Sequence, residues 1–521
     1  MRQAGARLRS AVKWLHHELG LSALIHAGRD THLLLLTRFL RMLAYSGVTL
    51  ILALHLRGLG NPEYRVGLFM TLTLLGDVLL SLLLTLVADG LLGRRRTLLA
   101  GSLLLAASGV VFAACDNFWV LLAAATLGVI SPSGSEIGPF RAVEESVIAH
   151  LTAPRDRPAV FAWYVVTASL GSALGLVMCG AVLDALKGVW GDELEGSEEK
   201  RFRAVFWGYA GAGIIKAGLT LLLSERCELD DCHERKEEEE DGGVATIAPE
   251  REFLEEDAER GPLLRNNDDR DRTGNGDPTP DSNSTVLIKR KATSNKTLIA
   301  RISPSSRLIL FKLCLLFSID SLSSGMVPYS WLNYYVSLTF SLPHGLLGAL
   351  MAANMVATAT MNLFSPALAR RIGLIRAMVF THLPAAVFLA MLGAARSSLA
   401  ATAVLLMARA SLNAMDQAPR SAFVAAVVKA EERTAVMGIV NVVRTLSQSG
   451  GPTITGVLAG EGRWWVTFVV AGSLKVVYDV GLLANFANTK LHESSSDGGG
   501  ENEGEDHTQN SEERQPENLR Q

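Results

Sequence analysis

Charged side chains are scarce in this sequence. Asp, Glu, Lys and Arg make up 19% of its 521 residues, whereas 49% are hydrophobic and the mean hydropathy is +0.25. A soluble protein of this length would not concentrate its charges into loops and tails as this chain does. Apolar windows long enough to span a bilayer recur along both halves. The composition therefore indicates an all-α membrane protein whose surface contacts the lipid bilayer.

Cysteine is also rare. The five cysteines, Cys115, Cys179, Cys227, Cys232 and Cys314, form no disulfide framework. Cys227 and Cys232 lie near His233, a spacing that suggests zinc, but a lone cluster in an acidic loop is interpreted as incidental. The sequence therefore predicts no metal site.

Nucleotide-binding signatures are missing as well. Neither a P-loop nor a Gly-rich dinucleotide fingerprint occurs in a suitable context. This pattern argues against ATP-driven pumping within the chain. We predict no cofactor, no nucleic-acid partner and no enzymatic activity.

Hydrophobic windows separated by turn signals predict twelve transmembrane helices. Asp116-Asn117 and Ala153-Pro154-Arg155 are two of these turn signals. The first six predicted spans, within residues 33–223, are 33–57, 64–88, 97–115, 118–149, 159–183 and 203–223. The second six, within residues 306–488, are 307–337, 345–368, 374–395, 398–428, 434–459 and 463–486.

An internal repeat relates the two groups of spans. The segment 128–180 matches 409–456: Glu136 precedes Pro139 as Asp416 precedes Pro419, and further matches are Arg157 with Arg433, Gly175 with Gly451 and Gly180 with Gly456. Two copies of one membrane unit predict two pseudo-symmetric six-helix bundles with a shared interface. Carriers place their substrate at such an interface.

The ends of the chain and the segment between the bundles differ in composition from the membrane portion. Residues 1–32 have a basic amphipathic pattern, which favours a helix on an anionic cytosolic leaflet over a mitochondrial presequence. Residues 224–305 and 489–521 are polar and acidic with little apolar content, so both are predicted to be disordered. Arginine-rich short loops on one side place the linker and both termini in the cytosol.

The loop between the second and third spans reads Ala88-Asp89-Gly90-Leu91-Leu92-Gly93-Arg94-Arg95-Arg96. It resembles the signature loop of the major facilitator superfamily, an Asp followed by Gly and a pair of basic residues. It departs from that signature by Thr85 in place of the first Gly and by one residue inserted between Asp89 and Gly93. The loop of the second half, 368–376, keeps Gly373 but has Ala369 in place of the Asp. The resemblance implies a transporter fold in which Asp89, Gly93, Arg94 and Arg95 form a gating loop.

Eight ionisable residues form the predicted substrate and proton pathway: Arg41, Asp77, Glu136, Arg141, Asp320, Asp416, Arg420 and Arg444. Charges inside a membrane are costly, so they face a bundle interior or a water-filled cavity. Asp77 and Asp320 fall near mid-helix in spans that line the cavity of the family this chain resembles. A carboxyl in low dielectric can exchange a proton in the physiological range. The alternative is a permanent pair with a basic residue such as Arg41 or Arg444.

The remaining charges suggest a gate and an anion site. Asp416 and Arg420 are one helical turn apart and are expected to pair within their helix. Glu136 partly repeats Asp416, so Glu136 and Arg141 complete a candidate gate. Arg444 lies near mid-depth and is expected to hold either an anionic substrate or a helix carboxylate. Glu144 is expected near the membrane surface, facing the arginines at 94–96.

The last span of each half carries a second repeat. Ala212-Gly213-Ile214-Ile215-Lys216 recurs as Ala471-Gly472-Ser473-Leu474-Lys475. Asp479 lies one turn after Lys475, so these two are expected to pair within the helix. By resemblance the sixth and twelfth spans flank the cavity, which predicts structural roles for both lysines.

These features predict a secondary active transporter that moves a small-molecule substrate by alternating access, with proton coupling. The alternative is a membrane sensor or scaffold that kept the fold without transport; a passive channel is disfavoured by the duplicated bundles. In the linker, Glu259-Arg260-Gly261-Pro262-Leu263-Leu264 matches the acidic dileucine pattern that sorting adaptors bind. Glu259, Leu263 and Leu264 therefore favour a vacuole- or lysosome-like endomembrane over the plasma membrane.

Overall fold

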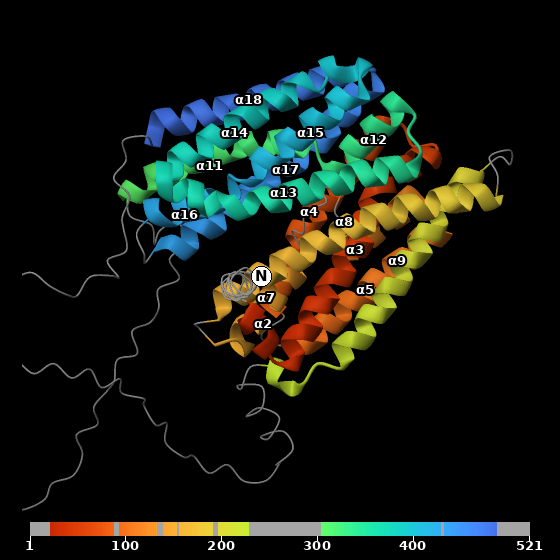
Figure 1. Ribbon diagram of the computed structural model, residues 1–521, viewed down its shortest axis with the longest axis horizontal. Coiled ribbons are helices and arrows are strands. Elements are labelled where there is room, and N and C mark those ends of the chain that lie inside the picture. Colours follow the sequence, from red (N-terminus) through yellow and green to blue (C-terminus); the bar gives the residue numbers. More distant parts are fainter. Residues whose placement is uncertain are drawn as a thin grey trace, which may run out of the picture. The chain divides into compact units, whose positions relative to one another are not determined.

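The computed structural model describes residues 21–87, 93–128, 130, 132, 139–153, 156–190, 196–228, 304–428 and 432–486 (Figure 1). Every helix or strand element in its described part is a helix. Runs of Leu, Ala and Val form helices here because a backbone surrounded by lipid must satisfy its hydrogen bonds within each segment. Several predictions fall on residues outside the described ranges: Glu136, Asp89, Glu259, Leu263 and Leu264, together with most of the linker and the C-terminal tail.

The first group of helices is named the N bundle. It comprises α2 (Leu21–His26), α3 (Arg29–Gly58), α4 (Glu63–Val87), α5 (Arg94–Ala114), α6 (Phe118–Leu127), α7 (Pro139–Leu151), α8 (Arg157–Trp190) and α9 (Ser197–Leu221), followed by the short helix η2 (Glu225–Cys227).

The second group is named the C bundle. It comprises α11 (Pro304–Met326), α12 (Tyr329–Phe340), α13 (His344–Ile372), α14 (Leu374–Met391), η4 (Ala394–Ser397), α15 (Leu399–Ala414), α16 (Gln417–Val427), α17 (Arg433–Gly460) and α18 (Trp464–Phe486). Most predicted span ends lie within a few residues of these bounds. In the described residues, nine segments are long and apolar enough to cross a membrane, and α11 with α12 counts as one of them.

Two predicted spans are interrupted in the described C bundle, and both interruptions lie beside a proline. The seventh span breaks between α11 and α12 at Val327-Pro328. The tenth breaks between α15 and α16 at Met415 and Asp416, although we predicted it as continuous. Pro419 has no N–H to offer the Met415 carbonyl. The Ser365 hydroxyl of α13 donates to that carbonyl instead, at 2.5 Å.

Glycines matched in the repeat hold equivalent helices together within each bundle. A β-carbon on Gly175 of α8 would lie 2.1 Å from the Leu43 carbonyl oxygen of α3. One on Gly451 of α17 would lie 2.2 Å from the Gly325 carbonyl carbon of α11. Contacts this short leave no room for a side chain, so both helix pairs depend on glycine. The two bundles thus repeat one packing arrangement.

The bundles meet mainly along two helix pairs, α4 with α17 and α8 with α13 (Figure 1), and also where α12 packs on α3. A β-carbon on Gly67 would lie 2.4 Å from the Pro452 carbonyl oxygen, and one on Gly180 would lie 2.4 Å from that of His344. Gly180 and its repeat partner Gly456 therefore both lie at this interface. The predicted shared interface has small residues on both of its sides.

Each bundle has two ends. The linker end is where α9 stops and α11 starts, and the far end is the opposite one. Four described arginines from the predicted arginine-rich loops, Arg94, Arg95, Arg370 and Arg371, lie in the helix turns at the linker end. Hydrogen bonds join the bundles in the far half, where Thr71 meets Thr453 at 2.7 Å and Asn333 Nδ2 donates to the Thr49 carbonyl at 3.0 Å.

Candidate functional site

A cavity of about 420 Å³ lies along the C bundle and reaches the N bundle at Arg141 of α7. Its wall is mainly polar and comes from α11, α12, α13, α15, α16, α17 and α18. The charged residues of the wall are Arg141, Asp320, Arg409, Asp416, Arg420, Arg444 and Lys475. Five of the eight predicted pathway residues therefore line one space: Arg141, Asp320, Asp416, Arg420 and Arg444.

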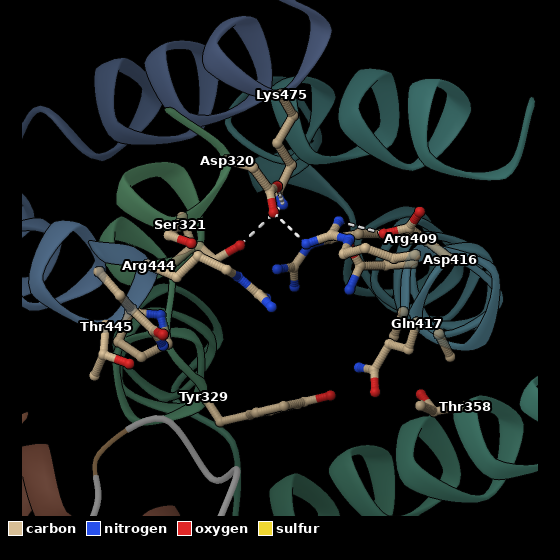
Figure 2. Close-up of a pocket in the computed structure, with 18 of the residues that line it drawn as sticks. Asp320, Ser321, Tyr329, Thr358, Arg409, Asp416, Gln417, Arg444, Thr445 and Lys475 are labelled. Carbon is tan, nitrogen blue, oxygen red and sulfur yellow. Dashed lines mark hydrogen bonds and ion pairs between the residues drawn. The ribbon is translucent and has the colours of Figure 1, made fainter. Parts of the chain in front are cut away.

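Asp320 is the centre of a buried ion-pair network on this wall (Figure 2). Its Oδ2 accepts from Arg420 Nη1 at 2.7 Å, and its Oδ1 accepts from Lys475 Nζ at 2.7 Å. Lys475 also donates to Ser324 Oγ at 3.0 Å. Asp320 is thus paired in this conformer, with Arg420 and Lys475 rather than with Arg41 or Arg444.

His382 extends the network behind the wall. Its Nδ1 lies 2.9 Å from Asp479 Oδ1, and its Nε2 lies 3.2 Å from Lys475 Nζ. The predicted pairing of Lys475 with Asp479 is therefore wrong, because Lys475 reaches Asp320 on α11 while Asp479 binds His382 on α14. Lys475 also lines the cavity, so the twelfth span does more than flank it.

The Arg420 guanidinium bridges two carboxylates. It bonds Asp320 and also Asp416, which lies one turn before it, so the predicted pairing of Asp416 with Arg420 is confirmed. The same guanidinium lies 5.3 Å from the ring centre of Tyr478 and 5.6 Å from that of Phe317. Arg420 is thereby held from three helices, α11, α16 and α18, and Asp416 lies at the break between α15 and α16.

Two further guanidiniums line the cavity without a carboxylate partner in the described part of the chain. Arg444 of α17 lies 5.6 Å from the Phe317 ring centre, and its Nε has no hydrogen-bond partner there. Arg409 of α15 lies within electrostatic range of the Tyr329 hydroxyl. Figure 2 shows Arg444 projecting into the cavity, with Tyr329 below it and Arg409 and Gln417 opposite. We expected Arg444 to hold either an anionic substrate or a helix carboxylate. Among the described residues, no helix carboxylate pairs with it.

The N bundle has its own buried ion-pair cluster, on the first and fourth spans. Arg41 of α3 makes two bonds to Glu144 of α7, at 2.9 and 2.6 Å. Tyr164 donates to Glu144 at 2.8 Å, and Lys216 Nζ lies 3.7 Å from it. Glu144 is 1% exposed, and its partners are Arg41, Tyr164 and Lys216 rather than the arginines at 94–96 that we expected it to face. Arg41 bonds this carboxylate instead of Asp77.

Asp77 differs from the other buried carboxylates. It lies in α4, is 1% exposed, and neither of its oxygens has a hydrogen-bond partner in the described ranges. Tyr209 of α9 lies within electrostatic range of both Asp77 and Arg41. Asp77 is not among the residues that line the cavity.

The described gate and loop residues occupy the linker end. Arg141 pairs with Glu145, one turn on, at 2.7 Å. Gly93 precedes α5 with φ +75°, a conformation that favours glycine, and Gly373 precedes α14 with φ +87°. The glycine of the signature loop thus starts the third helix of each bundle. Arg94 is buried, and Arg95 donates to the Leu221 carbonyl of α9 at 2.8 Å.

Sequence reasoning missed Arg409 and His382 and assigned the wrong partners to Glu144. Each is a charged or titratable residue within a predicted membrane span, the same signal that selected Asp77 and Asp320. Applied to every such residue, that criterion includes all three. The pairing of the charges depends on helix packing, which the sequence does not show.

Comparisons with known proteins agree on the fold. A family model described as Major Facilitator Superfamily matches residues 34–267 and 313–506. The uncharacterized membrane protein YJR124C of Saccharomyces cerevisiae is 32% identical over 460 residues, which cover 88% of this chain and 94% of that protein.

Solved transporter structures have a similar fold. The nucleoside transporter NupG has a TM-score of 0.59 at 12% identity, over 89% of this chain and 100% of its own. A D-xylose-proton symporter has a TM-score of 0.60 at 11% identity, over 87% and 96%. A bacterial homolog of the human lysosomal transporter Spinster, in an inward-facing conformation, has a TM-score of 0.56 at 14% identity, over 88% and 95%. The predicted all-α membrane fold, with twelve transmembrane helices in two pseudo-symmetric bundles, is confirmed.

Proposed function

This chain belongs to the Major Facilitator Superfamily, and on that premise we propose that it is a secondary active transporter, which moves a small solute across its membrane by alternating access with proton coupling. One observation carries the proposal. A charged cavity lies beside the interface between the two bundles. Among the described residues, the hydrogen bonds between the bundles lie in the far half of that interface. Such a site is suited to being reached from one side at a time.

The interface supports rocking of one bundle against the other. Besides the bonds at Thr71 and Thr49, Tyr334 donates to Glu63 at 3.1 Å, and the Gly345 N–H donates to Asp184 at 2.8 Å. Few side chains have to reorganise when these bonds break, because the helices cross at glycines. The far end can therefore open as a unit while the linker end closes.

Asp77 is the favoured site of the coupled proton. An isolated carboxylate buried away from water is costly, so Asp77 carries a proton in this conformer. Asp320 has two bonded cations and no comparable need for a proton. Release of the proton then requires a conformer in which water or a cation reaches Asp77, which links proton movement to the rocking of the bundles.

The gate is proposed to lie at the linker end. Asp416 and Arg420 adjoin the helix break, and Arg141 lines the same cavity. Closure of the linker end would bring α7 toward α16 and give the Arg141 guanidinium access to Asp416. Glu136 belongs to the proposed gate through its match with Asp416 in the repeat.

Transport can be tested with sealed vesicles. Vesicles with and without the full chain are loaded from a water-soluble metabolite extract under an imposed pH gradient, and their contents are compared without prior selection. The proposal expects at least one solute to accumulate uphill only with the protein, and to collapse when the gradient is abolished. If no solute moves, the sensor or scaffold alternative stands. If the chain is a sensor or scaffold, deletion of residues 229–301 should abolish its function. If it is a transporter, the same deletion should leave transport intact.

The location is proposed from the linker. The dileucine pattern at Glu259, Leu263 and Leu264 favours an acidic endomembrane over the cell surface, with the linker in the cytosol. Leu263→Ala combined with Leu264→Ala is expected to shift the tagged protein toward the plasma membrane. An unchanged location would mean that the motif binds no adaptor.

A further inference from the structure

The cavity wall has cationic groups in excess, and their arrangement identifies a class of solute. We propose that the transported solute is a small hydrophilic organic oxyanion, a carboxylate or a phosphate, whose anionic group binds between Arg409 of α15 and Arg444 of α17. This inference rests on the proposed transport function and specifies its substrate.

The first support is the pairing of the cations. Arg420 and Lys475 are bonded to carboxylates, and Arg141 is bonded to Glu145. Arg409 and Arg444 alone among the charged wall residues have no ion pair in the described part of the fold. A guanidinium that cannot lose its proton is costly to enclose without an anion. The missing counter-charge is therefore expected from the solute.

The second support is the balance of charge. The wall carries five cationic side chains and two carboxylates, Asp320 and Asp416. Two more carboxylates lie just behind it, Glu145 bonded to Arg141 and Asp479 bonded to His382. After all four carboxylates are counted, the excess is one positive charge if His382 is neutral and two if it is protonated. One bound oxyanion offsets this excess, whereas a cationic solute increases it.

The third support is the geometry of the donors. Arg409 and Arg444 come from different helices and project toward the same space above the Tyr329 ring (Figure 2). A guanidinium presents parallel N–H donors that match the two oxygens of a carboxylate or phosphate. Two such groups facing one space can hold an oxyanion from two sides.

The rest of the wall indicates a hydrophilic solute. Neutral hydrogen-bonding side chains fill most of the remaining surface: Ser321, Thr358, Asn413, Gln417, Asn441 and Gln448. A volume of about 420 Å³ falls within the range of small-molecule sites. Amide and hydroxyl groups at these positions suit hydroxyls or amides on the solute, and they disfavour a lipophilic compound.

The vesicle assay with a metabolite extract tests this inference. Solutes that accumulate with the unaltered chain are expected to carry an oxyanion at pH 7. Arg444→Gln and Arg409→Gln are each expected to reduce their uptake about tenfold or more, the usual effect of losing a charged hydrogen bond. Arg444→Lys keeps the charge but not the two-pronged geometry, so its uptake should lie between those of Arg444→Gln and the unaltered chain.

Matched variants and a second extract sharpen the result. Arg463→Gln removes a guanidinium that is 63% exposed at the far end, and it should leave uptake unchanged. Treatment of the extract with phosphatase removes the transported solute if it is a phosphate ester and spares it if it is a carboxylate. Should Arg444→Gln fail to fold, Arg444→Lys and Arg409→Gln provide the test.

Two outcomes separate this inference from the transport proposal. If every accumulated solute is neutral or cationic, or if uptake of an anion is unaffected by Arg409→Gln and Arg444→Lys, the oxyanion site is wrong while transport stands. If the unaltered chain moves no solute at all, the transport proposal fails and the inference fails with it. The expected result is uphill uptake of an oxyanion that both arginine variants reduce and Arg463→Gln does not.

Discussion

The Lys475 ammonium lies 2.7 Å from the Asp320 carboxylate, with both side chains buried in the C bundle. Its repeat partner Lys216 lies 3.7 Å from buried Glu144 in the N bundle. The two lysines match in sequence, yet their carboxylates come from different positions in the duplicated unit. Asp320 belongs to the first helix of its bundle, and Glu144 belongs to the fourth span of its own.

In the main ion pair of each bundle, the cation and the anion come from opposite helices. In the N bundle the first helix provides the cation, Arg41, and the fourth span provides the anion, Glu144. In the C bundle the first helix provides the anion, Asp320, and the tenth span provides the cation, Arg420. An ion pair thus joins the first span of each bundle to the fourth, and the helix that carries the cation in one bundle carries the anion in the other. Only the C-bundle pair lines the cavity.

Asp77→Asn is expected to uncouple transport. Asn resembles the protonated carboxyl in size, so the fold should persist, but it cannot release a proton. Exchange of labelled solute across the vesicle membrane should continue, while uphill accumulation driven by a pH gradient should disappear. Asp116→Asn is the matched control, because Asp116 is 59% exposed at the far end. Uphill uptake by Asp77→Asn with the normal pH dependence would place the proton elsewhere, with Glu136 next.

The ion pair of Asp320 with Lys475 is expected to stabilise the C bundle only when it is complete. Asp320→Asn leaves Lys475 and Arg420 buried with one carboxylate fewer, so unfolding should become easier by about 3–5 kcal/mol. Asp320→Asn combined with Lys475→Gln should recover part of that loss in a double-mutant cycle. The measurement is thermal unfolding of the purified protein. Arg463→Gln, in a half-exposed pair with Glu461, should change stability by at most about 1 kcal/mol.

Most of the helical architecture could be predicted from the sequence, because it depends on local composition. Runs of apolar residues fix the spans, and the proline at 328 marks the break between α11 and α12. The break at Met415 was missed because it depends on Ser365, which lies fifty residues earlier in the chain and compensates for the hydrogen bond that Pro419 cannot make.

The candidate site was predicted less completely. Charged side chains such as Arg420 and Arg444 are visible in sequence because they are rare in apolar helices. Their partners are not visible, since Asp320 lies 100 residues from Arg420 and 155 from Lys475. The pairing of Lys475 with Asp479 followed the one-turn rule for neighbours on a helix. That rule fails here because α18 presents the two side chains to different helices.

Gly67→Ala is expected to weaken the conformer in which the far end is closed. The added methyl group would clash with the Pro452 carbonyl of α17, at a cost of about 1–3 kcal/mol. The population of that conformer should then fall roughly fivefold or more. The measurement is the distance between spin labels at Trp119→Cys and Trp465→Cys, with the native cysteines replaced. Gly208→Ala, where a β-carbon meets open space, should leave the distances unchanged; a Gly67→Ala distribution like that of Gly208→Ala would contradict the assigned interface.

Alternating access itself is tested most directly by a reversible cross-link at the far end. The Thr71 and Thr453 hydroxyl oxygens lie 2.7 Å apart on opposite bundles, so Thr71→Cys and Thr453→Cys place two thiols within reach of a disulfide. Oxidation is expected to stop uphill uptake in vesicles, and a reductant should restore it, while either single variant transports under both conditions. Uptake that continues at the normal rate through fully cross-linked protein would contradict the account.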